Sequence, residues 1–262
     1  MDASRIAALL QPFLAADPSA AAESGHHASF LSAVSLSDSQ LRAISIYIDI
    51  LLRWNQKLNL TAVRNAESIV TRHFGESLFL AHHLFPVEAS GSAPGSSGNQ
   101  AQLDAAAGLG SGRDFGLGAK DAPVRVVDVG SGAGFPGIPL KLWNPELAVT
   151  LVESNHKKVA FLREVIRGVT LTNINVFGGR SEDYPASSAD FVTFRAVERF
   201  ESALPAAVRL LAPGGRVALL ISRSQLSTLA SLAPGISWDA PIAVPQSDSR
   251  VLQLGLAILE RP

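Results

Sequence analysis

Two kinds of hydrophobic pattern divide the chain. The first is an apolar face at helical spacing, made by Leu41, Ile44, Ile48, Leu51 and Leu52. This spacing predicts a helix that ends near Leu58, and Ser37 with Gln40 has the spacing of a capping box at its start. A second helix is expected after residue 65. Its inward positions are Ile69, Phe74, Leu78 and Phe85. The two helices are expected to pack as a cap on the part of the chain that follows.

In the second part, short apolar runs rich in β-branched residues alternate with helical patterns. Strands are predicted at 124–129, 149–152, 173–177, 191–194 and 216–221, with helices at 156–167 and about 200–211. Two more strands, 238–244 and 251–259, follow without a helix between them, which indicates an antiparallel pair at a sheet edge. The pattern predicts an α/β fold with a doubly wound, Rossmann-like sheet of seven strands behind an N-terminal helical cap.

Four segments follow from these patterns and the local composition. Residues 1–35 are rich in Ala and Ser and are expected to be weakly ordered, with a short helix from Ser4 to Ala16. Residues 36–85 form the cap. Residues 86–122 are a low-complexity stretch of Gly, Ser and Ala, expected to be a flexible insertion. Residues 123–262 form the core. His26 and His27 are adjacent without a third ligand nearby, so no metal site is expected.

The overall composition excludes several classes of protein. The 262 residues are 47% hydrophobic and 17% charged, with no apolar run of membrane-spanning length. The N-terminus lacks the pattern of an export signal, so a cytoplasmic location is expected. There is no cysteine, which excludes disulfides, thiolate metal sites and a cysteine nucleophile. Because the formal net charge is −1, any nucleic-acid surface must be local.

The clearest chemical signal lies between residues 124 and 142. A strand ends at Asp128 and runs into closely spaced glycines, Gly130, Gly132 and Gly134. Glycine permits positive φ and a close approach of a ligand to the backbone. Together with Gly137, the last two glycines also have the spacing of a dinucleotide-binding turn. The segment therefore predicts a strand, a ligand-binding turn and a helix.

Two acidic residues favour S-adenosylmethionine over a dinucleotide. Asp128 places a carboxylate before the turn, where it repels a pyrophosphate but attracts the ammonium of an amino acid. Glu153 ends the next strand, about where an acid binds ribose hydroxyls. Pro136 removes a backbone donor from the part of the turn that would face a phosphate. The alternative is a glycine-rich strand-to-helix turn without a ligand.

Several motifs around this turn resemble one family. The chain contains DVGSGAGFPGIPL, LVESNHKKVAFLRE, RSEDY and DFVTFRAV, with RWNQKLNLTAVRN and RHFGESL upstream. These motifs resemble the bacterial methyltransferases that modify a guanine N7 in small-subunit (16S) ribosomal RNA, first named as glucose-inhibited division protein B. The resemblance runs from about Leu41 to about Leu220, interrupted by one insertion. It implies the class I methyltransferase sheet, S-adenosyl-L-methionine as cofactor, and 16S ribosomal RNA or the small ribosomal subunit as the partner. Separately from the resemblance, we expect a monomer.

The resemblance also implies a set of cofactor-binding residues. With the rule that ligands bind at the carboxyl ends of parallel strands, the predicted set is Asp128, Gly130, Gly132, Gly134, Phe135, Glu153, Ser181, Glu182 and Arg195. Ser181 and Glu182 follow the third strand, where such enzymes hold the adenine. Arg195 ends the fourth strand, and an ion pair with Glu182 or Glu198 is the alternative role for it.

Basic residues form the candidate RNA surface. The predicted RNA-binding residues are Arg53, Lys57, Arg64, Arg72, His73, Arg195 and Arg223. Between Arg53 and His73 the only acid is Glu67, and this local excess of cations can contact phosphates or form a solvated helix face. Two segments depart from the family pattern. Gly75-Glu76-Ser77 stands where Leu-Asp-Ser is usual, and Leu220-Ile221-Ser222-Arg223 stands where Leu-Lys-Gly is usual.

Methyl transfer to guanine N7 depends on alignment rather than on acid–base chemistry. N7 has a free lone pair and no proton to lose, so we assign no general base and no catalytic residue. A donor to the neighbouring O6 would help to hold the base, and Arg195 is placed for this role or for the cofactor. The alternatives are transfer to another RNA or a small molecule, a catalytically silent RNA-binding protein and, more distantly, an NAD-dependent oxidoreductase.

Overall fold

A central mixed sheet organises the molecule. The computed structural model describes residues 1–15, 34–86, 122–195 and 199–258. The sheet has eight strands in the order β3-β2-β1-β4-β5-β8-β6, with β7 paired to β8. The strands are β1 (Arg125–Val129), β2 (Ala148–Val152), β3 (Ile174–Phe177), β4 (Ala189–Arg195), β5 (Leu211–Ser222), β6 (Ile236–Trp238), β7 (Ile242–Ala243) and β8 (Arg250–Ala257). The predicted α/β, Rossmann-like fold is confirmed.

The antiparallel edge differs from the sequence prediction. Strands β1 to β5 all run parallel to one another. Strand β8 pairs with β5 and runs antiparallel to it. The single strand predicted at 238–244 is instead two short strands, β6 and β7, which both pair with β8. Pro241 lies between them and has no N–H to donate to the ladder, which interrupts the pairing. The sheet therefore has one strand more than predicted.

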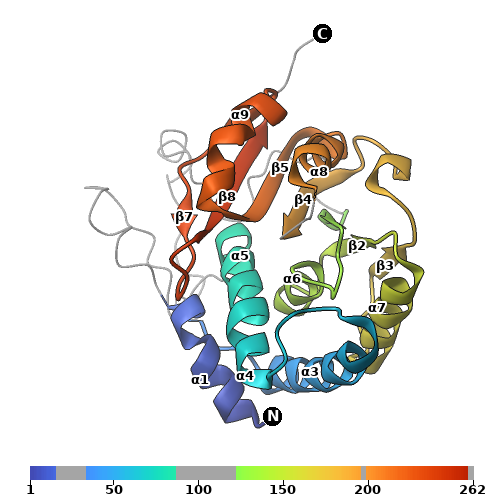
Figure 1. The fold of residues 1–262 in the computed structure, drawn as a ribbon, viewed down its shortest axis with the longest axis vertical. Coiled ribbons are helices and arrows are strands. Elements are labelled where there is room, and N and C mark those ends of the chain that lie inside the picture. The colour runs from blue at the N-terminus through green and yellow to red at the C-terminus, as the bar shows by residue number, and fades with distance from the viewer. Residues whose placement is uncertain (16–33, 87–121, 196–198, 259–262) are drawn as a thin grey trace, which may run out of the picture.

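Helices cover both faces of the sheet. The first face carries α3 (Asp38–Leu58), α5 (Glu76–Leu84), α6 (Gly137–Trp143) and α7 (His156–Gly168), and the second carries α8 (Phe200–Val208) and α9 (Leu229–Leu232). Figure 1 shows α3 and α8 on opposite sides of the strands. Four shorter turns are α4 (Ala66–Ile69), η1 (Val70–Gly75), η2 (Ser181–Asp183) and η3 (Arg223–Thr228). Each face of the sheet is buried under its own hydrophobic cluster.

The predicted capping box starts α3. The amide of Gln40 donates to Ser37 Oγ at 3.3 Å, and the Ser37 amide donates back to Gln40 Oε1 at 2.8 Å. Gln40 Nε2 also donates to the carbonyl of Leu142 at 2.8 Å, which ties the start of α3 to the end of α6. Apolar side chains of the cap and of the sheet belong to one hydrophobic cluster. The cap therefore shares its core with the sheet.

The short helix predicted from Ser4 to Ala16 is present in the structure. Helix α1 (Ala3–Leu14) buries Ile6, Leu10, Phe13 and Leu14 in the core. Its Phe13 ring packs on Gly75, where an added Cβ would lie 2.6 Å from Phe13 Cε2. A glycine at position 75 thus makes room for α1, which accounts for the departure from leucine at this position. The predictions for His26, His27 and the 86–122 insertion concern residues that lie almost entirely outside the described ranges.

The second predicted helix forms with an irregular centre. Residues 66–84 are helical throughout, but η1 in the middle is a π-helical turn. Such turns are frequent at functional sites because they displace side chains from the regular helical spacing. Here the turn carries Arg72 and His73, two of the predicted RNA-binding residues.

Candidate functional site

A cleft of about 820 Å³ opens at the carboxyl ends of the parallel strands. The cap contributes residues 59–63 and part of η1, and the sheet contributes the turns that follow β1, β2, β3 and β4. Most of the predicted cofactor residues line the cleft: Gly130, Gly132, Phe135, Glu153, Ser181, Glu182 and Arg195. Asp128 and Gly134 do not line it. The topology thus gathers residues from distant parts of the chain around one cavity.

The glycine turn is held in place by Glu153. Gly130 adopts φ 66° in this turn, a conformation that side chains with a Cβ rarely take. Glu153 Oε2 accepts from the Gly132 amide at 2.9 Å, and its Oε1 accepts from the Asn155 amide at 2.8 Å. The residue is 6% exposed and lines the cleft. Glu153 therefore braces the turn, and its carboxylate retains lone pairs for a ligand.

Tyr47 joins the cap to the same turn. Its hydroxyl donates to the carbonyl of Ala133, and its ring stacks on Phe135 with centroids 5.2 Å apart and planes 4° apart. Gly134 is required here, since an added Cβ would lie 2.5 Å from the Tyr47 hydroxyl. Sequence analysis missed Tyr47. Its only signal was its place beside Ile48 on the buried side of the predicted helix.

Asp128 supports the turn from behind. Its side chain is fully buried, and Oδ2 accepts from the Gly137 amide at 3.2 Å. Oδ1 has no hydrogen-bond partner among the described residues. Burial raises the pKa of Asp128 from 3.8 to about 7. The structure thus places this carboxylate against the start of α6, not at the cleft surface where the sequence analysis expected it to meet an ammonium group.

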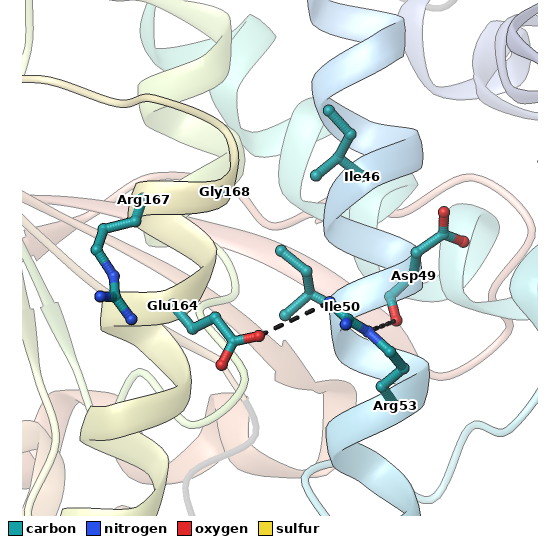
Figure 2. A pocket seen from close by; sticks show the side chains of 7 residues that line it. All are labelled: Ile46, Asp49, Ile50, Arg53, Glu164, Arg167 and Gly168. Carbon is teal, nitrogen blue, oxygen red and sulfur yellow. Dashed lines mark hydrogen bonds and ion pairs between the residues drawn. The ribbon is translucent and has the colours of Figure 1, made fainter.

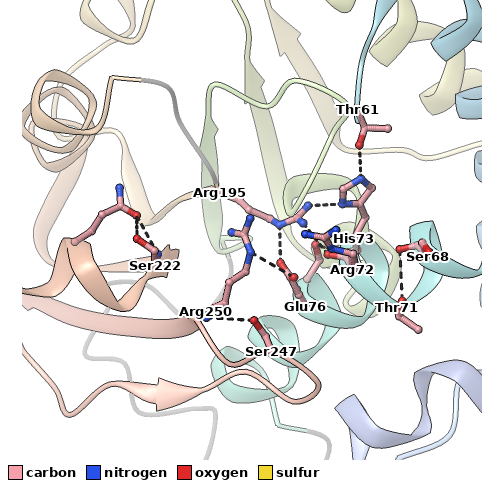
Figure 3. A network of polar contacts seen from close by, with 12 residues as sticks. Thr61, Ser68, Thr71, Arg72, His73, Glu76, Arg195, Ser222, Ser247 and Arg250 are labelled. Atoms are coloured by element: carbon pink, nitrogen blue, oxygen red, sulfur yellow. Dashed lines mark hydrogen bonds and ion pairs between the residues drawn. The ribbon is translucent and has the colours of Figure 1, made fainter. Parts of the chain in front are cut away.

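Arg195 is the centre of a polar network between β4 and the cap (Figure 3). Its Nε donates to Glu76 Oε2 at 2.9 Å, its Nη1 lies 2.9 Å from His73 Nδ1, and its Nη2 donates to the Arg72 carbonyl at 2.6 Å. Arg250 Nε lies 3.6 Å from Glu76 Oε1. Among the described residues the ion-pair partner of Arg195 is therefore Glu76 and not Glu182. Glu198 lies outside them.

His73 is neutral in this network. Burial, followed by the adjacent positive charge of Arg195, lowers the pKa of His73 from 6.5 to about 3. A guanidinium group only donates hydrogen bonds, so Nδ1 must accept from Arg195. The ring hydrogen therefore lies on Nε2, which is 2.7 Å from Thr61 Oγ1. His73, one of the predicted RNA-binding residues, is therefore an uncharged link between Arg195 and Thr61.

The predicted RNA-binding residues fall into three groups. Arg72, His73 and Arg195 line the cleft. Arg53 instead lies in a groove between α3 and α7, where Figure 2 shows its guanidinium turned toward Glu164 at 3.7 Å. The remaining three, Lys57, Arg64 and Arg223, are exposed and line neither cavity.

Four basic residues of the cleft were missed. These are Lys158, Arg180, Arg199 and Arg250. The first three follow the carboxyl ends of β2, β3 and β4, so the same strand-end rule that selected Glu153 also selects them. Arg250 starts β8, and because that strand runs antiparallel its first residue meets the carboxyl end of β5. With Arg72, these residues give the cleft an excess of positive charge.

Comparisons with known proteins identify the family. A family model described as rRNA small subunit methyltransferase G matches residues 40–90 and 117–237. A protein of Chloroflexus aggregans named ribosomal RNA small subunit methyltransferase G is 31% identical over 241 residues, 87% of this chain and 87% of that protein. A protein of the same name from Xanthomonas oryzae pv. oryzae is 36% identical over 203 residues, 77% of this chain and 76% of that protein. The chain belongs to the rRNA small subunit methyltransferase G family.

The family match agrees with the predicted resemblance. The unmatched stretch between residues 90 and 117 lies within the segment that the sequence analysis treats as an insertion. A solved SAM-dependent methyltransferase from Aquifex aeolicus has a TM-score of 0.44 and 18% identity, over 55% of this chain and 86% of that chain. No helix within the described residues has both the length and the apolar character needed to cross a bilayer. In the same residues, no cluster of side chains suited to hold a metal ion is present.

Proposed function

We propose that this protein transfers the methyl group of S-adenosyl-L-methionine to N7 of a guanine in 16S ribosomal RNA. The observation that carries the proposal is that the family match covers both the cap and the sheet, the two parts that together line the cleft. The relatives from Chloroflexus and Xanthomonas are named for ribosomal RNA methylation. The alternative of a nicotinamide-dependent oxidoreductase has no support from these relatives.

The residues of the cleft fit this cofactor. The open turn at Gly130 admits a ligand close to the backbone, and Glu153 lines the cleft with lone pairs suited to ribose hydroxyls. Ser181 and Glu182 lie at the end of β3 and are suited to the adenine. We propose that Gly132, Gly134, Phe135 and Asp128 shape the same site. Phe135 does so through its buried packing, and Asp128 through its hydrogen bond to the start of α6. When bound, the cofactor supplies an electrophilic methyl group on a sulfonium.

The proposed mechanism is alignment of the acceptor atom with the methyl group of the cofactor. Guanine N7 attacks in line with the methyl group, and because it loses no proton the chain needs no general base and no metal. The polar network around Arg195 fixes the wall of the cleft next to β4. Residues of the cap line the opposite side of the cleft.

The RNA side of the site is basic. We propose that Arg72, Lys158, Arg180, Arg199 and Arg250 attract the phosphates around the acceptor nucleotide, with Arg53, Lys57, Arg64 and Arg223 as contacts farther from it. Each neutralised phosphate adds to the salt dependence of binding. We further propose that the protein acts as a monomer in the cytoplasm, where small ribosomal subunits are found.

The test is methyl transfer from labelled S-adenosylmethionine to small ribosomal subunits from cells that lack this protein. Nucleoside analysis of the digested RNA is expected to show label in 7-methylguanosine. The Gly130→Val variant is expected to lose both transfer and cofactor binding. Gly214→Val is the matched control, because Gly214 has a similar φ of 73° but does not line the cleft. Label in another nucleoside, or none with the wild-type chain, would contradict the proposal.

A further inference from the structure

The hydrogen-bond chain from Arg195 ends at the hydroxyl group of Thr61, a residue that lines the cleft. Arg195 donates to His73 Nδ1, so the hydrogen on His73 Nε2 is donated to Thr61 Oγ1. The Val63 amide also donates to Thr61 Oγ1, at 3.1 Å. A hydroxyl oxygen has two lone pairs. Both lone pairs of Thr61 Oγ1 are therefore occupied by donors of the protein.

The hydrogen of this hydroxyl has no acceptor within the described part of the chain. Thr61 is half-buried and lines the cleft, and Figure 3 shows it at the end of the network from Arg195 and His73. Its backbone is held on both sides by Asn55, whose Oδ1 accepts from the Thr61 amide and whose Nδ2 donates to the Thr61 carbonyl, both at 3.0 Å. Thr61 is thus a fixed hydroxyl that can donate to a ligand but cannot accept from one.

The topology places Thr61 away from the end of the cleft proposed for the adenosine. In the sheet, β2 and β3 lie on one side of β1 and carry Glu153 and Ser181 at their ends, whereas β4 lies on the other side and carries Arg195. Thr61 is connected to Arg195 and therefore belongs to the β4 side. Because the adenosine is proposed to occupy the β2 and β3 side of the cleft, the β4 side is left for the acceptor base.

Arg195 spends three of its five guanidinium N–H groups within the protein. Its Nε, Nη1 and Nη2 are all engaged by Glu76, His73 and the Arg72 carbonyl, and its side chain is 8% exposed. From the sequence, Arg195 was predicted to donate to guanine O6 or to contact the cofactor. We assign this role instead to the Thr61 hydroxyl, two hydrogen bonds along the network, with Arg195 as a positioning residue.

We propose that Thr61 selects guanine as the acceptor base by donating a hydrogen bond from its hydroxyl to O6. Guanine presents two acceptors, N7 and O6, on this edge, whereas adenine presents N7 beside an N6 amino group that donates. A hydroxyl with both lone pairs occupied can serve O6 but has nothing to offer the amino group. This inference rests on the proposed function, because it assumes that N7 of a purine is the acceptor.

The first test compares Thr61→Val with Thr61→Ser in the full-length protein. The valine variant lacks the hydroxyl, and its kcat/KM for unmethylated small subunits is expected to fall about 10- to 100-fold. The serine variant keeps the hydroxyl and is expected to stay within about 3-fold of the wild type. The Kd for S-adenosylhomocysteine, measured by calorimetry, is expected to change less than about 2-fold in both. Full activity of the valine variant, or an equal loss of cofactor affinity, would overturn the inference.

A second test separates recognition of O6 from a structural role of Thr61. Once nucleoside mapping has located the acceptor, subunits are reconstituted with 2-aminopurine at that position, which keeps N7 but lacks O6. The wild type is expected to lose about 10- to 100-fold in kcat/KM on this substrate, and Thr61→Val is expected to lose nothing further. If 2-aminopurine lowers the kcat/KM of Thr61→Val by the same factor as that of the wild type, Thr61 acts only on the fold. Failure of the proposed function would be seen earlier, as the absence of 7-methylguanosine with wild-type protein.

Discussion

Arg195 and Glu76 are separated by 119 residues in the chain, yet Arg195 Nε lies 2.9 Å from Glu76 Oε2. Both side chains are buried, at 8% and 5% exposed. The pair connects the carboxyl end of β4 to the start of α5. It thereby links the wall of the cleft to the cap.

Removing Glu76 is expected to be costly. Glu76→Ala leaves the Arg195 guanidinium buried without its counter-ion, which is expected to lower the free energy of unfolding by about 3–5 kcal/mol. Urea unfolding measures the loss. Glu67→Ala is the matched control, since its ion pair with Arg5 has a similar distance of 2.8 Å but both side chains are 54% exposed. The control is expected to change the unfolding midpoint far less, because solvent screens this pair. Equal losses in the two variants would contradict this account.

Gly134 is expected to tolerate no side chain. An added Cβ would lie 2.5 Å from the Tyr47 hydroxyl and 2.7 Å from Ile138 Cδ1, and φ is already +87°. Gly134→Ala is expected to lower the free energy of unfolding by about 2–4 kcal/mol through strain and overpacking together. Gly214 has φ +73° and nothing within 4 Å of an added Cβ, so Gly214→Ala reports the backbone strain alone, about 1 kcal/mol. If both variants lose a similar amount of unfolding free energy, the Tyr47 side chain moves aside without cost and this account is wrong.

The buried carboxyl of Asp128 is expected to make stability depend on pH. Its pKa rises from 3.8 to about 7 on folding, so the folded chain binds this proton more tightly than the unfolded chain. Stability from this group is complete below about pH 4 and is lost as pH rises to about 7. Glu153 adds to the shift and Arg195 opposes it.

The Asp128→Asn variant isolates this effect. Asparagine keeps an oxygen for the Gly137 amide but does not ionise, while all other titrating groups stay the same. Between pH 5.5 and pH 8 the wild type is expected to lose about 2 kcal/mol relative to the variant, at about 1.4 kcal/mol per pH unit up to pH 7. Urea unfolding of both chains across this range measures the difference. A difference that does not vary with pH would mean that Asp128 does not titrate there.

Tyr47 is expected to stabilise the glycine turn through its hydroxyl. Tyr47→Phe keeps the stacking on Phe135 but leaves the Ala133 carbonyl without its donor. The free energy of unfolding is expected to fall by about 1–3 kcal/mol, with weaker binding of S-adenosylhomocysteine because the turn loosens. Tyr184→Phe is the control, since the Tyr184 hydroxyl donates at 3.2 Å to Thr150 Oγ1 away from the cleft. Calorimetry measures the affinity of both variants for S-adenosylhomocysteine. An equal fall in the two would refute the link between the Tyr47 hydroxyl and the glycine turn.

The sequence determined the elements of this protein because their signals are local. The capping box at Ser37 and Gln40, the glycines after β1 and the alternation of strands and helices each depend on residues a few positions apart. The strand-end rule then brought Gly130, Glu153 and Ser181 to one cleft, since the carboxyl ends of parallel strands meet at one edge of the sheet. The resemblance to family motifs predicted the remaining cofactor-binding residues.

Only the tertiary structure decided which polar groups meet. Docking of the cap brings Glu76 and His73 to Arg195. Asp128 is buried and does not line the cleft, and α1 places Phe13 on Gly75. The spacing of charges along a chain does not show which of several acids an arginine will reach. That choice depends on desolvation and on the geometry of packed elements far apart in sequence, and it is fixed only when the cap and the sheet close on one core.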